Sequence, residues 1–346
     1  MPFDKFKDLS VGVFGDYCLD EYLWIDSALN EPSLETGLIA YQCIKRETSP
    51  GAAGTTAKNL KNLGIGTVYA IGFTGDDGRG LELCRGLDNL GVNRDNIIKT
   101  DTRITATHTK PWIINPDGSK EELNRIDIKN MTQTSTTLED EVLSKVNELI
   151  NLLDALIIQD HWVEENRGII TDNVRRSLNE LAGVNPDKVI YVDSRCRVGL
   201  FENMILKGNL FELTHSVYGL GKSRSDAKVQ LAADPTVTRT DDEINNACST
   251  LQRRNNRPVI CTMGERGIRI YSNDEPITIP AIPISGQTDV TGAGDMFTAW
   301  FVSSLAAGAD LVEASKIGNA AAAICVSQIG SSGYVTCDDV LKMMNN

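Results

Sequence analysis

The chain has 346 residues, of which 41% are hydrophobic and 23% charged, a composition typical of a folded globular protein with a large core. Its 34 Lys and Arg against 47 Asp and Glu give a formal net charge of -13, which disfavours a broad surface for nucleic acid or an anionic membrane. No apolar run has the length of a membrane-spanning helix, and the charged N-terminal segment does not match a signal peptide. We therefore expect a cytoplasmic protein with no nucleic-acid or membrane partner.

The eight cysteines and three histidines are scattered along the chain, and no two cysteines form a Cys-x-x-Cys pair. Cysteines in apolar segments of a chain without an export signal are typical of reduced, mostly buried thiols. The spacing of the cysteines and histidines matches no zinc-binding motif. We interpret His108, His161 and His215 as ordinary polar or core residues.

Short apolar runs alternate with helical patterns along most of the chain, as in a parallel sheet with crossover helices. The predicted strands are Val11–Gly15, Thr67–Gly72, Ala155–Gln159, Val189–Val192 and Val259–Thr262. The predicted helices are Thr56–Leu63, Gly80–Leu90, Leu138–Leu153, Arg167–Leu181 and Glu243–Arg254. This alternation predicts a doubly wound α/β domain with a mainly parallel sheet between helices.

Two segments break the alternation, because residues of about 21–46 and 105–128 alternate apolar and polar side chains as extended strands do. In the second segment, the turn signal Asn115-Pro116-Asp117-Gly118 separates the strand-like runs Thr109–Ile114 and Leu123–Ile128, which predicts a hairpin. There is no internal repeat or long linker, so the whole 346-residue chain is expected to form one domain. We expect both segments to leave that domain and build a small sheet over an active-site edge.

The most informative motif is Asp289-Val-Thr-Gly-Ala-Gly-Asp295, where a glycine-rich turn opens a long apolar helix. Small residues at 292–294 let backbone amides approach an anion, and the helix dipole favours negative charge at the same point. Phosphate is the ligand that this arrangement suits. From the residues alone, Asp295 fits either a charge complement to the helix N-terminus or a base facing a bound phosphoryl group.

This motif, at its distance from the C-terminus, resembles the signature of the PfkB (ribokinase-like) family of carbohydrate kinases. Further similar motifs follow in family order: Gly15-Asp16 with Asp20, Pro50-Gly51, the N-x-x-E element Asn209-Leu210-Phe211-Glu212, and the nucleotide loop Thr262-Met263-Gly264-Glu265-Arg266-Gly267. The resemblance covers nearly the whole chain and implies a ribokinase-like fold with a small β-sheet lid. Residues 15–22 and Arg125-Ile126-Asp127 are most similar to the heptose 7-phosphate kinase branch of the family.

The resemblance implies an ATP-dependent kinase that moves the γ-phosphoryl group to a hydroxyl of a sugar or sugar phosphate. Asp295 would remove the hydroxyl proton while the amides of Gly292, Ala293 and Gly294 hold the developing charge. The lid would close over the sugar and exclude water, so that ATP is not hydrolysed.

The nucleotide is expected to lie against the two other motifs. Asn209 and Glu212 would orient the phosphates and Mg²⁺, with Glu212 reaching the metal through water, and Thr262, Gly264 and Gly267 would line the nucleotide. Alone, the first motif also fits an exposed helix start and the second a plain turn. Their joint order favours the kinase interpretation, which leaves open a monovalent cation near the anion site.

The substrate end departs from the family pattern. The residues expected to contact the substrate are Asp16, Asp20, Gly51, Ala52, Thr55, Lys110 and Arg195. The family usually has glycine where this chain has Ala52 and asparagine where it has Thr55, and both changes would alter recognition of a sugar. The chain has Asp193-Ser-Arg195 where the heptose branch usually has D-P-K. Arg195 could therefore supply a cation for a substrate phosphate or be an ordinary surface charge, and the same two interpretations hold for Lys110.

Two other nucleotide motifs are not supported. Gly219-Leu-Gly-Lys222-Ser223 ends like a P-loop, but Ser216 stands where its first glycine should be, so we interpret it as a surface loop. No G-x-G-x-x-G follows the first predicted strand, which argues against a dehydrogenase.

Three functions remain open from the sequence. The leading one is a sugar or sugar-phosphate kinase, expected to pair as a homodimer through an apolar lid face with Trp24 and Trp112 as candidates, although core packing also explains both tryptophans. The second is a nucleoside kinase of the same family with an apolar base pocket on the lid. The third is a non-catalytic nucleotide-binding member whose sugar site has eroded at Ala52 and Thr55.

Overall fold

The computed structural model describes residues 2–218, 239–273, 275–328 and 333–345. Within these ranges, nine strands form a central sheet in the order β16-β15-β14-β13-β12-β11-β1-β6-β7. The strands are β1 (Ser10–Gly15), β6 (Thr67–Gly75), β7 (Asn93–Thr100), β11 (Ala155–Asp160), β12 (Val189–Ser194), β13 (Ile205–Asn209), β14 (Val259–Thr262), β15 (Ile268–Tyr271) and β16 (Ile277–Ile279). Neighbouring strands run parallel from β7 to β14, and β15 and β16 are antiparallel, which confirms the predicted mainly parallel α/β sheet.

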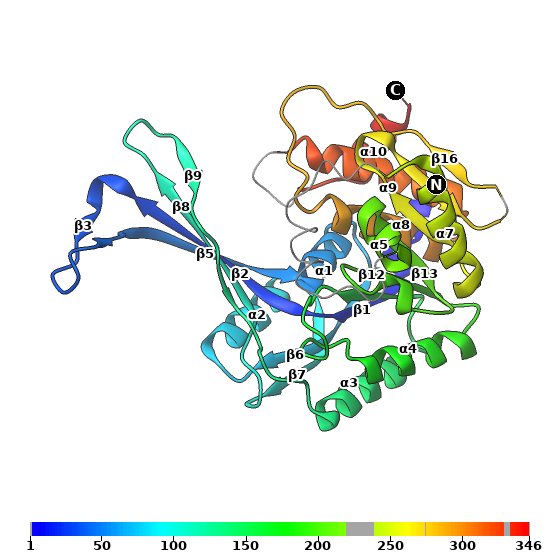
Figure 1. The fold of residues 1–346 in the computed structure, drawn as a ribbon, viewed down its shortest axis with the longest axis horizontal. Coiled ribbons are helices and arrows are strands. Elements are labelled where there is room, and N and C mark those ends of the chain that lie inside the picture. The colour runs from blue at the N-terminus through cyan, green and yellow to red at the C-terminus, as the bar shows by residue number, and fades with distance from the viewer. Residues whose placement is uncertain (1, 219–238, 274, 329–332, 346) are drawn as a thin grey trace.

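Helices cover both faces of this sheet (Figure 1). They are α1 (Ala53–Asn62), α2 (Gly78–Asn89), α3 (Thr136–Leu149), α4 (Asp172–Val184), α5 (Leu210–Tyr218), α7 (Asp241–Asn255), α8 (Ala293–Ala306), α9 (Leu311–Val326) and α10 (Cys337–Asn345). Because side chains alternate along a strand, Val11 and Val13 of β1 pack in the core with α1, α8 and α9, whereas Phe14 packs in the core with α3, α4 and α7. The sheet is thus buried on both faces.

The sequence patterns missed some elements. Strands β7, β13, β15 and β16 were not predicted. Strand β7 is a half-buried edge strand rich in polar residues, β13 contains Lys207 and Gly208, β15 contains Arg269, and β16 has only three residues. The predicted helix Arg167–Leu181 begins only at Asp172. Thr171 fixes this start, because its side chain accepts a hydrogen bond from the amide of Val174 and forms the N-cap of α4.

A second, smaller sheet, which we call the lid sheet, extends away from the main body (Figure 1). Its strands are β2 (Tyr17–Asp26), β5 (Cys43–Ala52), β8 (Thr107–Ile114), β9 (Lys120–Glu122) and β10 (Ile126–Ile128), with the short pair β3 (Glu31–Pro32) and β4 (Ile39–Ala40) at its far end. Strands β2 and β8 run parallel, and β5, β9 and β10 are antiparallel to their neighbours.

The predicted hairpin lies in this sheet with a different second arm. Gly118 has a φ of 83°, and its amide donates a hydrogen bond to the carbonyl of Asn115 at 2.8 Å, which closes the turn between β8 and β9. The arm predicted as one strand over Leu123–Ile128 is divided between β9 and β10.

Two of the connections between the lid sheet and the main body contain no linker. Only Asp16 separates β1 from β2, and β5 runs directly into α1 at Ala53. The amide of Ala53 donates to the carbonyl of Asp16 at 3.0 Å, so the two connections are tied to each other. The root of the lid sheet therefore lies at the carboxyl end of β1.

Two further expectations concern the whole chain. All eight cysteines lie in the described residues and none of them forms a disulfide; Cys18, Cys248, Cys261 and Cys325 are buried. In the described part of the chain, no helix combines the length and apolar character needed to cross a membrane.

Candidate active site

Polar residues gather where the parallel strands end. Register pairs Gly15 with Gln159, Gln159 with Asp193 and Asp193 with Lys207, so these residues form a row along the carboxyl edge of β1, β11, β12 and β13. Between this edge, the lid sheet and the start of α8 lies a cavity of about 440 Å³, large enough for a small ligand. The predicted site residues that line it are Asp16, Asp20, Ala52, Thr55, Lys110, Arg195, Gly292 and Asp295. Parallel strands open a crevice at this edge, which is where α/β folds bind ligands.

Asp295 lies in the first turn of α8 and is held by two side chains that the sequence analysis did not single out. Its Oδ1 accepts hydrogen bonds from Gln159 Nε2 at 3.1 Å and from Thr56 Oγ1 at 3.2 Å, and Gln159 Nε2 also donates to Thr56 at 2.7 Å. Burial raises the pKa of Asp295 to about 6, with repulsion from Asp193 in the same direction. A carboxylate with such a pKa suits proton transfer near neutral pH.

The turn before Asp295 has the backbone that an anion site needs. Gly292 has a φ of 77° and precedes α8, and the first turn of a helix leaves amides without intrahelical partners. The amide of Ala293 donates to the carbonyl of Val290 at 3.3 Å, so an anion would compete with that carbonyl for this amide.

A buried ion pair, absent from the sequence prediction, lies beside this turn. Lys207 Nζ is 2.7 Å from Asp193 Oδ2, and it would be 3.2 Å from a Cβ on Gly294. Burial alone would lower the pKa of Lys207, but attraction to Asp193 raises it above its ordinary value, so the ammonium stays charged. One feature of the sequence indicated such a pair: Lys207 directly follows the apolar residues Ile205 and Leu206 of a strand, and a lysine is almost never buried unless it is paired.

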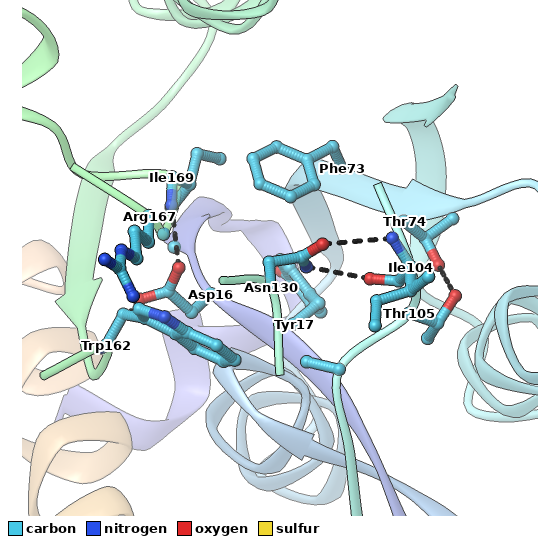
Figure 2. Close-up of a pocket in the computed structure, with 13 residues that line it drawn as sticks. Asp16, Tyr17, Phe73, Thr74, Ile104, Thr105, Asn130, Trp162, Arg167 and Ile169 are labelled. Atoms are coloured by element: carbon cyan, nitrogen blue, oxygen red, sulfur yellow. Dashed lines mark hydrogen bonds between the residues drawn. The ribbon is translucent and has the colours of Figure 1, made fainter. Parts of the chain in front are cut away.

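Asp16 is fixed by backbone amides. Its Oδ2 accepts from the amides of His161 and Trp162 at 3.1 and 3.0 Å. Its Oδ1 accepts from the amide of Ile169 at 2.8 Å (Figure 2). Burial, with repulsion from Asp160, nevertheless raises its pKa to about 6. The cavity in Figure 2 has a volume of about 20 Å³, enough for about one water molecule and too small for a sugar.

The lid sheet contributes a charged face to the main cavity. Asp20 Oδ2 lies 3.4 Å from Lys110 Nζ, and its Oδ1 lies 3.4 Å from His108 Nδ1. Although burial acts against it, these neighbours lower the pKa of Asp20, so its carboxylate is ionised. Lys110 also lies over the Tyr22 ring, 4.9 Å from its centroid.

The departure at Ala52 leaves the backbone in a conformation suited to glycine. Ala52 has a φ of 52° and a ψ of -118°, immediately before α1, and it lines the cavity beside Thr55. A Cβ on its neighbour Gly51 would lie 2.7 Å from Asp20 Cγ and 2.8 Å from Cys18 Sγ, so Gly51 is required by close packing. Arg195 is exposed at the cavity wall.

The two proposed nucleotide motifs lie side by side and outside the cavity lining. Asn209 and Thr262 are register partners at the ends of β13 and β14. The amide of Asn209 donates to Glu212 Oε2 at 2.7 Å, and the amide of Glu212 donates to Asn209 Oδ1 at 2.9 Å, which is the pattern of a helix capping box. Burial, with repulsion from Asp193, raises the pKa of Glu212 to about 7 although Lys207 opposes it.

The loop after β14 requires its two glycines. Gly264 and Gly267 have φ values of 57° and 81°, and a Cβ on Gly267 would collide with the carbonyl of Ile279. The P-loop-like segment Gly219–Ser223 lies outside the described residues.

Comparisons with known proteins agree with these motifs. Residues 206–336 match the model of the pfkB family carbohydrate kinases. Among curated proteins, the chain is 26% identical over 338 residues to the bifunctional protein HldE of Aliarcobacter butzleri (97% of this chain, 64% of that protein) and 27% identical over 336 residues to that of Helicobacter acinonychis (96% and 66%). The chain thus spans a little less than two thirds of the length of these relatives.

Solved structures show the fold. Arabidopsis thaliana ribokinase complexed with ribose and ATP aligns with a TM-score of 0.65 at 20% identity (98% of this chain, 99% of that one). Phosphofructokinase-2 from Escherichia coli in complex with potassium aligns with a TM-score of 0.67 at 16% identity (97% and 98%). The predicted ribokinase-like fold and the resemblance to the PfkB family are confirmed.

Proposed function

We propose that this chain, as a member of the PfkB carbohydrate kinases, transfers the γ-phosphoryl group of ATP to a hydroxyl of a sugar phosphate such as a heptose 7-phosphate. The observation that carries the proposal is the half-buried Asp295 at the start of α8, which faces a cavity whose opposite wall is the lid sheet with Asp20 and Lys110. The similarity of residues 15–22 and 125–127 to the heptose 7-phosphate kinase branch supports this acceptor.

In the proposed reaction, Asp295 takes the proton of the attacking hydroxyl, and Gln159 and Thr56 keep its carboxylate oriented. The amides at the N-terminus of α8 and the ammonium of Lys207 stabilise the negative charge that develops on the transferred phosphoryl group. Asp16 and Asp20 accept hydrogen bonds from sugar hydroxyls, and Gly51 and Thr55 shape that end of the cavity.

Oxygen donors fit a magnesium ion on the nucleotide side. Glu212 uses Oε2 in the capping box, and a second carboxylate oxygen remains for a water of hydrated Mg²⁺, with Asn209 beside it. Mg²⁺ would neutralise charge on the phosphates of ATP. Thr262, Gly264 and Gly267 would lie along the nucleotide, and a monovalent cation near the anion site remains part of this proposal.

A phosphorylated acceptor is favoured over a nucleoside. Lys110 lies over the Tyr22 ring and beside Asp20, so this ring face is not open for stacking with a base. Arg195 and Lys110 instead offer positive charge to a substrate phosphate at the cavity wall.

The test is ADP release from Mg-ATP with a panel of hexoses, heptoses, their phosphates and nucleosides. Asp295→Asn should lower turnover of the accepted sugar by about 10²- to 10⁴-fold with ATP binding intact. Asp310→Asn, the same change at the start of α9, is the matched control and should keep full turnover. Turnover of the panel that is equal in wild type and Asp295→Asn would contradict the proposed base.

The panel also separates the alternatives. Arg195→Ala should raise KM for a phosphorylated sugar roughly 10-fold or more, the loss expected for one charge-assisted hydrogen bond. Turnover of nucleosides alone would establish the nucleoside kinase instead. ATP binding without turnover of any acceptor would favour the non-catalytic member.

A further inference from the structure

The register of the lid sheet brings three metal-binding side chains together. Asp20 on β2 pairs directly with His108 on β8, and Cys18 lies two residues before Asp20, hence on the same face of β2. All three side chains line the main cavity, whereas Leu19 between them is buried on the other face. The root of the lid sheet therefore presents a sulfur, an oxygen and a nitrogen donor to one point.

The distances among these donors match those around a tetrahedral zinc ion. His108 Nδ1 lies 3.6 Å from Cys18 Sγ and 3.4 Å from Asp20 Oδ1, and the three donor atoms lie within 4.8 Å of one another. Zinc bonds of about 2.3 Å to sulfur and about 2.0–2.1 Å to nitrogen or oxygen hold tetrahedral neighbours about 3.5 Å (S to N) and about 3.3 Å (N to O) apart. The two measured edges already have these lengths.

We propose that Cys18, Asp20 and His108 form a Zn²⁺-binding site at the root of the lid sheet, with the fourth coordination position open to the cavity. Three protein ligands with an open position are typical of an accessible zinc site. Among the residues that the structure describes, this is the only group of three or more such donors close enough to hold a metal ion. A thiol and an imidazole favour Zn²⁺ over Mg²⁺, so the magnesium that accompanies ATP would not fill the site.

The surroundings allow a metal ion to enter and be held. Cys18 is buried, whereas the side chains of His108 and Asp20 are 23% and 18% exposed, so the donors can be reached from the cavity. Lys110 contacts Oδ2 of Asp20, which leaves Oδ1 on the side of the cluster. Burial raises the pKa of the Cys18 thiol, so Zn²⁺ would displace a proton from sulfur as it binds.

Occupancy of this site has a consequence for the sugar. Because Asp20 is one of the residues proposed to bind a hydroxyl, Zn²⁺ and the sugar would exclude each other, and zinc would inhibit competitively with the acceptor. This consequence rests on the proposed function. Binding of the metal itself does not.

The test is a calorimetric titration of the full chain with Zn²⁺ in a metal-free buffer, followed by Co²⁺ as a spectroscopic probe of thiolate ligation. Wild type should bind a single ion in this site, with a Co²⁺–thiolate charge-transfer band. Cys18→Ser and His108→Gln should each weaken Zn²⁺ binding at least about 10-fold, since even outer-shell substitutions reach that size. Cys43→Ser, which removes an exposed thiol from the same sheet, is the matched control and should bind as wild type does.

Absence of Zn²⁺ binding by wild type would overturn the site. An unchanged affinity for Zn²⁺ in both Cys18→Ser and His108→Gln would also overturn it. If one of these variants does not fold, the other alone decides. Inhibition of ADP release by Zn²⁺, relieved by excess acceptor, then tests the consequence separately. Zinc bound through Cys18 in a protein without kinase activity would retain the metal site and reject the proposed function.

Discussion

Ala52 has a backbone conformation that suits glycine better than alanine. Its φ of 52° and ψ of -118° lie in a region that only glycine adopts without strain, and such strain costs of order 1–3 kcal/mol. The strain lies in the wall of the proposed sugar site. The chain therefore has a glycine-type backbone at a position that holds an alanine.

We predict that Ala52→Gly stabilises the protein by about 1 kcal/mol, because relief of strain exceeds the entropy that glycine adds to the unfolded chain. Urea unfolding measures the change. Ala53→Gly, one residue later in α1, is the matched control and should destabilise by about 1 kcal/mol. Equal destabilisation by both substitutions would contradict the strain at residue 52.

The ionised carboxylate of Asp295, which is the form that acts as a base, should lower the free energy of unfolding. Its pKa is about 6 in the folded protein against an ordinary 3.8, so the folded state binds the proton more tightly than the unfolded chain. This residue's contribution is therefore favourable below its ordinary pKa and is lost as pH rises through about 6. Two pKa units correspond to about 3 kcal/mol at most.

Accordingly, Asp295→Asn should be more stable than wild type by about 1–3 kcal/mol at about pH 8, and the difference should shrink towards about pH 4. Chemical unfolding at both pH values checks this, with Asp310→Asn, the same substitution at the start of α9, as the matched control. A less stable Asp295→Asn at the higher pH would show that the carboxylate is held more favourably than its burial indicates.

At the residue scale, the sequence predicted the functional motifs but not their neighbours. Asp295 and Asp16 could be found because glycine turns and strand ends mark them. The residues that Gln159, Lys207 and His108 contact could not be predicted, because those contacts depend on which strands pair and in which register. Spacing along the chain shows no zinc motif, since Cys18 and His108 meet only through the pairing of β2 with β8.

At the element scale, α5 begins with a capping box that also forms the N-x-x-E motif. Asn209 and Glu212 bond each other's amides, so a structural role and the proposed magnesium role belong to the same two side chains. The two roles differ in their need for charge, because glutamine serves at this position of a capping box as well as glutamate does.

We predict that Glu212→Gln changes the melting temperature little but raises the Mg²⁺ concentration needed for half-maximal turnover. Asn209→Ala is the comparison, and loss of the cap should cost it about 1 kcal/mol of stability. Thermal melts and Mg²⁺ titrations measure the two effects. An unchanged Mg²⁺ requirement in Glu212→Gln would leave the motif with its capping role alone.

Elements whose sequence pattern reflects burial were predicted well. The almost fully buried β1, β11 and β12 contain apolar runs, whereas β7 at the sheet edge exposes polar side chains to solvent and has no such pattern. The start of α4 was predicted too early because it is set by one hydroxyl, that of Thr171, and the apolar periodicity used for the prediction does not take such a cap into account.

At the scale of the whole molecule, the far end of the lid sheet exposes apolar side chains. Leu34, Leu38, Ile39, Tyr41 and Ile44 are each more than half exposed, whereas Trp24 and Trp112 pack on each other with ring centroids 6.0 Å apart. Exposed apolar side chains gathered in one region are typical of an interface, so we propose that two copies pair through this end.

This proposal predicts that Leu38→Glu shifts the protein from dimer to monomer in sedimentation velocity. Leu38 is 71% exposed, and Leu152→Glu, at a comparable exposure of 63% after α3, is the matched control that should leave the dimer intact. A wild-type monomer at the highest concentration studied would rule the interface out.

The direct passage of β1 through Asp16 into β2, and of β5 through Ala52 into α1, has a mechanical meaning. These two connections contain no linker, so a change in the angle of the lid sheet changes the dihedral angles at Asp16 and Ala52. The other two connections, residues 101–106 before β8 and 129–135 after β10, are longer. Both Asp16 and Ala52 lie in the proposed sugar site. The residues about which the lid sheet would rotate are thus also residues proposed to bind the acceptor. A sugar hydroxyl hydrogen-bonded to Asp16 would therefore restrict the orientation of the ten-residue strand β2, and with it the position of the whole lid sheet.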